Sequence, residues 1–239
     1  MNVYPAFLLF LFGHVLGDFY FQNEKMAKRK NEKLSLLVMH GAIYALVMAF
    51  LLFGIFQYQS NLLWIWITVS GSHILIDFSK KYVKLKRIFT IDQITHVLVL
   101  SVAWFLWGRG LSLNSYAENI SQSIPVDIPL IILGLLIILR PISMLIESND
   151  IWDFGESRKS SVMIGYLERI IVFFLLFTGQ FAAIAFVIAA KTAARFPEIT
   201  AGNAENSENK LKSEYYLIGT LLSMTSVFLV AYLLGLIGF

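Results

Sequence analysis

The chain has 239 residues, of which 57% are hydrophobic and 15% aromatic, and its mean hydropathy is +0.69. Charged residues make up only 15%, against about 25% in soluble domains. Several apolar runs approach the roughly 20 residues that cross a bilayer. We therefore expect an all-α fold, a polytopic integral membrane helical bundle. The chain contains no cysteine, which excludes disulfides, thiolate metal sites and a cysteine nucleophile.

The formal net charge is +3 and the sequence pI is about 9.0, so a nucleic-acid partner has to be considered. The lysines and arginines gather beside apolar runs, as they do in the cytoplasmic loops of membrane proteins. No basic face with interleaved aromatic residues is present. We therefore expect no nucleic-acid partner and place the protein in a membrane.

The first half of the chain, residues 1–108, contains four apolar runs and forms one predicted domain. The predicted spans are Val3–Gln22, Leu34–Phe56, Leu62–Phe78 and Phe89–Gly108. The intervening loops at 23–33 and 79–88 are rich in lysine and arginine, so the positive-inside rule places them in the cytoplasm and the N-terminus outside. A polar stretch at 109–123 is then an extracytoplasmic linker.

The second half, residues 124–239, is predicted to contain two clear spans and one longer run. The spans are Ile124–Glu147 and Tyr215–Gly238. The run Val162–Ala190 is long for one span and short for two, and Thr178 with Gly179 is a plausible break. This pattern favours a pair of short helices or a re-entrant hairpin at 162–190. The whole chain then has about seven or eight transmembrane or re-entrant helices.

Three pairs of one histidine and one aspartate, each four residues apart, are the main functional signal. They are His14 with Asp18, His73 with Asp77 and Asp92 with His96, and His40 stands alone in the second span. Residues i and i+4 lie on one face of a helix, where an imidazole and a carboxylate can share one metal ion. With the predicted topology all seven residues lie within roughly 10–12 Å of the cytoplasmic ends of their spans. Ionisable residues at such positions mark functional sites.

Neutral imidazoles and carboxylates suit a divalent metal, with zinc first and manganese or iron next. Seven candidate ligands exceed what one tetrahedral ion needs, so the cluster is expected to hold one or two ions or to include acid–base residues. The expected metal ligands are His14, Asp18, His73, Asp77 and His96, and the expected catalytic residues are Asp92 and His40. The alternative is a polar network that links four helices.

Charged residues at a similar predicted depth are candidates for substrate binding. Arg140, Glu168 and Arg169 reach this level in the second half, and Lys80 and Gln93 border the His/Asp pairs. The cations are expected to hold a phosphate. The alternative is that Glu168 and an arginine form an ion pair that only neutralises charge.

These motifs resemble DUF3307, a family of bacterial membrane proteins with a domain of unknown function. Its members show H-x-x-x-D-F-x-x-Q, a His in the second span, H-x-x-x-D and D-Q-x-x-H. The matching positions here are His14, Asp18, Gln22, His40, His73, Asp77, Asp92, Gln93 and His96. The second half is similar to longer members of the family. The resemblance implies a fold and these marked positions. Residues 14–96 also resemble membrane-bound metal-dependent hydrolases, which favours hydrolysis.

The sequence therefore predicts a membrane-embedded, metal-dependent hydrolase that acts on a lipid or a phosphoester at the cytoplasmic side. Its metal would lower the pKa of a bound water toward about 7. Whether the protein is an enzyme stays open. One alternative is a non-catalytic scaffold or sensor, as a homo-oligomer or with a soluble cytoplasmic partner on residues 191–214. The other is a proton or divalent-metal transporter, but the outer halves of the first four spans contain few polar residues.

Overall fold

The computed structural model describes residues 4–22, 26, 30, 33–82, 88–125, 127–148, 158–194 and 207–237, without the side chains of 4–6, 88, 158–161 and 207–216. Across these ranges the chain forms nine α-helices, and its β pairing is an isolated bridge between Phe56 and Leu113. The prediction of an all-α fold is confirmed. The chain divides into two compact units, residues 1–126 and 127–239.

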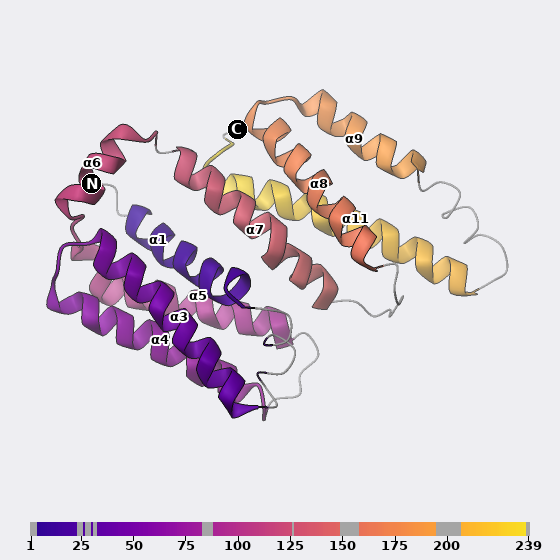
Figure 1. Cartoon of the computed structure of the whole chain (residues 1–239). Coiled ribbons are helices and arrows are strands. Elements are labelled where there is room, and N and C mark those ends of the chain that lie inside the picture. The colour runs from indigo at the N-terminus through magenta and orange to yellow at the C-terminus, as the bar shows by residue number, and fades with distance from the viewer. Residues whose placement is uncertain are drawn as a thin grey trace. The chain divides into compact units, whose positions relative to one another are not determined.

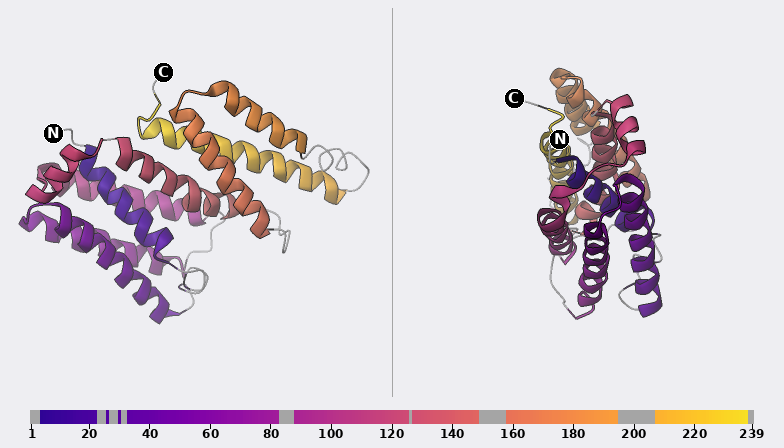
Figure 2. Two further views of the ribbon diagram at one scale, coloured as in Figure 1. Left: turned by 45° about the horizontal axis from the view of Figure 1, so that its top comes forward. Right: turned by 90° about the vertical axis from the view of Figure 1, so that its left-hand side faces the viewer.

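The first unit contains four long helical segments that lie side by side (Figures 1 and 2). They are α1 (Tyr4–Val15) with the one-turn π-helix η1 (Leu16–Tyr20), α3 (Leu34–Ile55), α4 (Ser60–Ser79) and α5 (Ile88–Trp107). A 3₁₀ turn, η2 (Gly108–Gly110), and the short helix α6 (Ser115–Ser123) follow. The four long segments begin and end within a few residues of the predicted spans. Helix α6 lies in a stretch for which only a polar linker was predicted.

Glycines let the helices of the first unit approach closely. A Cβ atom added to Gly13 would lie 2.6 Å from Met48 Sδ, and one added to Gly17 would lie 2.8 Å from the Tyr44 ring. The G-x-x-x-G pair of α1 and η1 therefore packs against α3 within the same chain. Gly41 of α3 meets Ile74 of α4 in the same way, 2.7 Å from its Cδ1 and closer still to Cγ1.

The inward face of the first unit changes from polar at one end to apolar at the other. On α3 the buried side chains run from His40 through Tyr44 to Met48 and Leu52. Helices α4 and α5 show the same change. The apolar part contains Phe10, Met48, Leu52, Phe56, Leu62, Ile65, Val69, Leu100, Ala103 and Leu111. The polar part is buried as well. The ionisable side chains therefore lie at one end of the unit and the apolar core at the other.

The second unit contains α7 (Asp127–Ser148), α8 (Arg158–Phe177), α9 (Phe181–Ala194) and α11 (Ser207–Leu233). The predicted break in the run 162–190 is confirmed, because α8 ends at Phe177 and Gly179 has φ of +70°, a left-handed conformation that favours glycine. A core that includes Ile138, Val172 and Val227 joins these helices.

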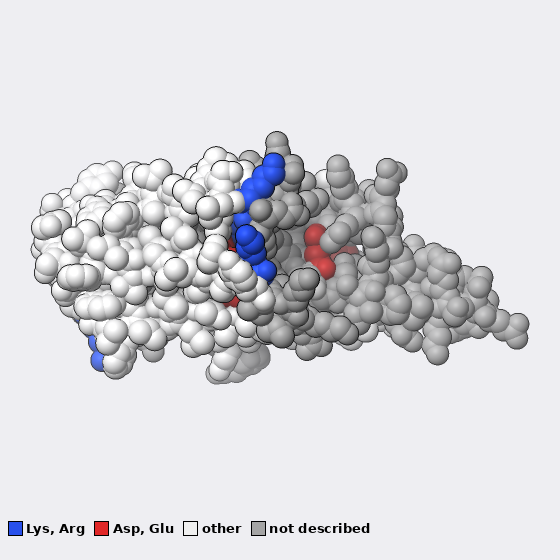
Figure 3. Space-filling model, turned by 90° about the horizontal axis from the view of Figure 1, so that it is seen from below, with Lys and Arg blue, Asp and Glu red and all other residues white. Residues whose placement is uncertain are grey.

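Four described helices, α3, α4, α5 and α7, are long and apolar enough to cross a membrane. Three shorter apolar stretches are Phe7–Tyr20, Phe181–Ala194 and Leu217–Leu233. On the face drawn in Figure 3, the described side chains are almost all uncharged. These features are compatible with a membrane protein. Most of the basic loop at 23–33, residues 83–87 of the second basic loop and residues 195–206 of the segment 191–214 lie outside the described residues, and the orientation stays a prediction.

Candidate metal centre

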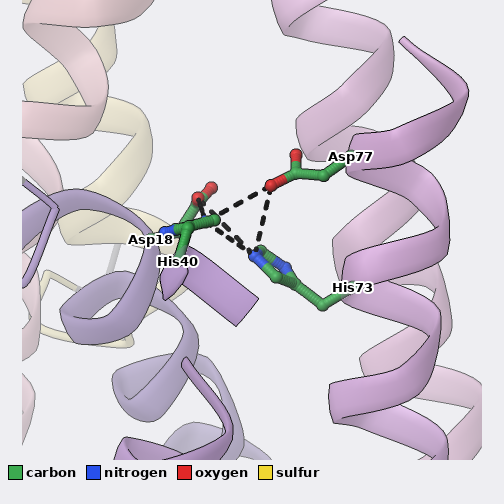
Figure 4. Close-up of side chains that lie close together, drawn as sticks. All are labelled: Asp18, His40, His73 and Asp77. Carbon is green, nitrogen blue, oxygen red and sulfur yellow. Dashed lines mark hydrogen bonds and ion pairs between the residues drawn. The ribbon is translucent and has the colours of Figure 1, made fainter. Parts of the chain in front are cut away.

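Four buried side chains from three helical elements point toward one another at the polar end of the first unit (Figure 4). Asp18 comes from η1, His40 from α3, and His73 and Asp77 from successive turns of α4. Their relative exposures are 4%, 0%, 1% and 1%, so none has appreciable contact with solvent. We call these four residues the first group.

The donor atoms of the first group have the spacing of a metal coordination shell. The Nε2 atoms of His40 and His73 are 3.0 Å apart. Asp18 Oδ1 lies 3.2 and 3.8 Å from these two nitrogens, and Asp77 Oδ2 lies 3.3 and 3.7 Å from them. Tetrahedral zinc with bonds of about 2.0–2.2 Å keeps its ligand atoms about 3.3–3.6 Å apart. The five distances between ligand atoms of the first group are therefore close to those in a tetrahedral zinc site.

The ligand atoms of the first group direct several lone pairs toward one point. At 3.0 Å the two Nε2 atoms cannot both direct a proton at each other, so at least three of the four donor atoms present lone pairs. Both carboxylates are buried, and buried charges are stable only when opposite charges compensate them. The Nδ1 atoms of His40 and His73 are also buried without a hydrogen-bond partner. A divalent ion at the centre would satisfy the converging lone pairs.

A second group shares Asp77 with the first. Asp77, Asp92 and His96 offer one ligand atom each within 4.8 Å of one another, and all three are buried. The Nδ1–H of His96 donates a hydrogen bond to the backbone oxygen of Asp92 at 2.8 Å, and Nδ1 lies 3.3 Å from Asp92 Oδ1. The other ring nitrogen of His96, Nε2, is buried without a hydrogen-bond partner.

Two lysines contribute positive charge to these groups. Lys30 Nζ lies 2.7 Å from Asp77 Oδ2 and 3.5 Å from Asp18 Oδ1. Lys80 Nζ pairs with Asp77 Oδ1 and lies 2.8 Å from Asp92 Oδ2. Burial lowers the pKa of Lys80, but the carboxylates of Asp77, Asp92 and Asp18 outweigh this and raise the pKa above its ordinary value. Lys80 is therefore charged at neutral pH.

Gln93 connects the two groups to His14. Its Nε2 donates to Asp18 Oδ2 at 2.9 Å and to Asp92 Oδ2 at 3.1 Å, so its oxygen can accept a hydrogen bond from His14 Nε2 at 3.2 Å. The Tyr44 hydroxyl then donates to His14 Nδ1 at 3.3 Å. Both ring nitrogens of His14 are engaged, and His14 belongs to neither group. The Tyr44 ring also stacks on His73 with 3.7 Å between centroids, which fixes the imidazole plane.

The π-helical turn explains why Asp18 and His14 have different surroundings. The Phe21 amide bonds the Leu16 carbonyl five residues earlier, at 2.9 Å. Such wider turns often occur at functional sites. In a regular α-helix Asp18 would lie one turn after His14 on the same face of the helix. The wider turn changes the direction of Asp18, so that its Oδ1 meets the nitrogens of His40 and His73.

The structure thus brings the seven histidines and aspartates singled out from the sequence into one connected cluster, together with Lys80 and Gln93. It places His40, a predicted catalytic residue, among the donors of the first group, and His14, a predicted ligand, beside them. Arg140, Glu168 and Arg169 belong to the second unit. There Glu168 pairs with Lys191, and Arg169 donates to Ser143.

Lys30 and Tyr44 are the residues that the sequence analysis missed. Lys30 lies in a basic run, where each lysine was interpreted as a topology determinant. Tyr44 lies four residues after His40, and that spacing, which was applied to the His/Asp pairs, could have identified it.

Residues 6–123 match the model of a family described as "Protein of unknown function (DUF3307)". The matched segment includes both groups, both lysines and Gln93. No curated protein and no solved structure matches the chain. Because the family match ends at residue 123, the similarity of the second half to longer members stays a prediction.

Proposed function

Because this chain belongs through residues 6–123 to the DUF3307 family, whose function is unknown, we propose its role from the geometry of the metal centre. The protein is a membrane-embedded metalloprotein that binds a divalent ion through the first group. Its reaction is the hydrolysis of a lipid or another phosphoester at the cytoplasmic side of the membrane.

The observation that carries the metal proposal is the set of five separations, from 3.0 to 3.8 Å, between four buried donor atoms. Two imidazole nitrogens and two carboxylate oxygens are ligands that zinc, manganese and iron accept. A network that served only to join helices would not need two buried carboxylates around two facing imidazoles.

Hydrolysis makes a further demand on this centre. Four protein ligands complete a tetrahedral zinc shell, as in structural sites, whereas a catalytic ion keeps a position for water. A five- or six-coordinate ion in the first group would provide that position. The second group could do so too, because its three donors match the number of protein ligands in catalytic zinc sites. The coordination number therefore separates a catalytic centre from a structural one.

Lys80 supports an anionic substrate. Its charged ammonium lies between Asp77 and Asp92 and is 13% exposed, so it is the cation of the site that a phosphate oxygen would meet. Phosphate groups are commonly bound by a lysine next to a metal ion. We therefore favour a phosphoester over a neutral ester.

One alternative also has support from the geometry. Lys30 and Lys80 neutralise two of the three carboxylates, so a metal-free polar network in a scaffold or sensor would be electrostatically reasonable. Transport has less support, because among the described residues the inward face beyond Tyr44 is apolar and offers no polar path.

The first test is elemental analysis of the full chain purified in detergent, beside His73→Ala and Ser72→Ala. Ser72 precedes His73 on α4 and donates to the Val69 carbonyl of its own helix, so it is a matched control. We expect one or two equivalents of zinc, manganese or iron in the wild type and in Ser72→Ala, and a loss of at least one equivalent in His73→Ala.

X-ray absorption at the metal edge then gives the coordination number. Five or six ligands, together with phosphoester turnover that is lost in His73→Ala, support the hydrolase. Four ligands without turnover indicate a structural metal. A folded wild-type protein that binds no metal contradicts the proposal and favours the polar network.

A further inference from the structure

Lys30 lies where its positive charge opposes a metal ion in the first group. An ion bound to Asp77 Oδ2 would lie about 2.0–2.2 Å from that oxygen. Lys30 Nζ lies 2.7 Å from the same oxygen, so the ammonium and the ion would be at most about 5 Å apart. Two cations at that distance in a buried site repel each other strongly.

The charge balance points to the same conclusion. Asp18, Asp77 and Asp92 carry three negative charges, and neutral histidines add none. One divalent ion and the Lys80 ammonium neutralise these three charges completely. The Lys30 ammonium would then be an excess positive charge in a buried cluster, which is costly.

The two lysines differ in how firmly they are held. Lys80 follows the last turn of α4 and pairs both with Asp77 of the first group and with Asp92 of α5, which lies outside that group. Asp92 therefore remains as a partner of Lys80 when the first group binds an ion. Both partners of Lys30, Asp18 and Asp77, are members of the first group. Lys30 comes from the connection between η1 and α3, where its amide bonds the Met26 carbonyl.

We propose that Lys30 is a built-in competitor for the metal, whose ammonium leaves Asp18 and Asp77 when an ion enters the first group. This inference rests on the proposed metal site. Metal uptake is then an exchange of one cation for another, in which Lys30 gives up its contacts with Asp18 and Asp77. The displaced ammonium also becomes available to an anionic ligand.

The first experiment compares zinc affinity in the full chain, wild type against Lys30→Met and Lys33→Met, by competition with a chromophoric chelator. Methionine keeps an unbranched apolar side chain and removes the charge. Lys33 is an exposed lysine three residues later and is the matched control. We expect Lys30→Met to bind zinc about tenfold more tightly and Lys33→Met to bind it like the wild type.

The outcomes separate this inference from the metal site itself. Equal or weaker zinc binding in Lys30→Met, with zinc still bound by the wild type, overturns the exchange and leaves the metal site intact. Absence of zinc binding in the wild type and in Lys30→Met overturns both.

A second experiment uses the wild-type chain, so that it does not depend on the folding of a variant. A lysine-acylating reagent is applied with and without one equivalent of zinc, and modification is read by mass spectrometry. Lys30 is 7% exposed in its ion-paired position. We expect zinc to increase its modification severalfold and to leave Lys33 unchanged. Unchanged modification of Lys30 with zinc bound contradicts the exchange.

Discussion

Gln93 shows how one neutral side chain can organise a charged site. Its amide group donates to one carboxylate in each group and accepts from His14, so it fixes the orientation of three residues, which lie on α1, η1 and α5. A glutamine can do this because its terminal amide carries two donors and one acceptor. The D-Q-x-x-H motif of α5 therefore contains two candidate ligands and the residue that positions their neighbours.

Replacing Gln93 by leucine should destabilise the first unit. The change leaves Asp18 Oδ2 and Asp92 Oδ2 without their amide donor, and a buried polar group that loses its partner costs about 1–3 kcal/mol. Thermal unfolding in detergent measures the effect. The control is Thr95→Ala on the same helix, where the lost hydroxyl bonds the Ile91 carbonyl at 2.8 Å. Equal melting temperatures for the two variants would show that the Gln93 hydrogen bonds contribute little.

At the scale of elements, the contact between α3 and α4 determines the separation of His40 and His73. Gly41 follows His40 in sequence, and Ile74 follows His73, and these two residues meet where the helices pack. A side chain at residue 41 would displace the β-branched Ile74, which has little rotamer freedom. The glycine thus permits the 3.0 Å approach of the two imidazoles.

Gly41→Ala should therefore weaken both folding and metal binding. Overpacking of this kind costs about 1–3 kcal/mol, and separation of the helices lengthens the distances between donor atoms. Gly54→Ala is the control on the same helix, because nothing lies within 4 Å of its added Cβ, and alanine there should stabilise the helix by about 0.5–1 kcal/mol. The two variants are compared by melting temperature and zinc affinity. A Gly41→Ala protein as stable as Gly54→Ala would show that Ile74 moves aside freely.

The elements also show what the sequence could and could not predict. Apolar runs predicted α3, α4, α5 and α7 well, because burial and lipid contact both require apolar residues. The left-handed Gly179 was identifiable from the Thr-Gly pair. The π-helical turn was not predictable, because its sequence L-G-D-F-Y also fits a regular α-helix. Lys30 could not be assigned either, because its ion pairs join residues 47 and 12 positions apart, which helical spacing does not report.

At the scale of the whole molecule, the first unit contains the complete candidate site. Every residue of both groups, both lysines, Gln93, His14 and Tyr44 lie within residues 1–126, and the family match covers 6–123. The unit also has its own apolar core. The candidate metal centre and an apolar core therefore lie in the same half of the chain.

We expect residues 1–126, expressed alone in a membrane and purified in detergent, to keep helical structure and to bind the same number of metal equivalents as the full chain. Circular dichroism and elemental analysis measure the two properties. The fragment 127–239 is the control and should bind none at the corresponding concentration. A helical fragment 1–126 that lacks the metal found in the full chain would show that the second half contributes to the centre.

The apolar end of the inward face of the first unit affects how metal binding responds to the membrane voltage. In a bilayer, an ion that enters from the polar end reaches the first group without passing Met48 and Leu52. A charge gains about 2.3 kcal/mol per 100 mV only when it crosses the whole membrane field. An ion that stops at the polar end, before the apolar core, crosses only a small part of that field. A change in the membrane potential should therefore hardly change the occupancy of the metal centre. The cell's ion supply, rather than its membrane voltage, would then control this protein.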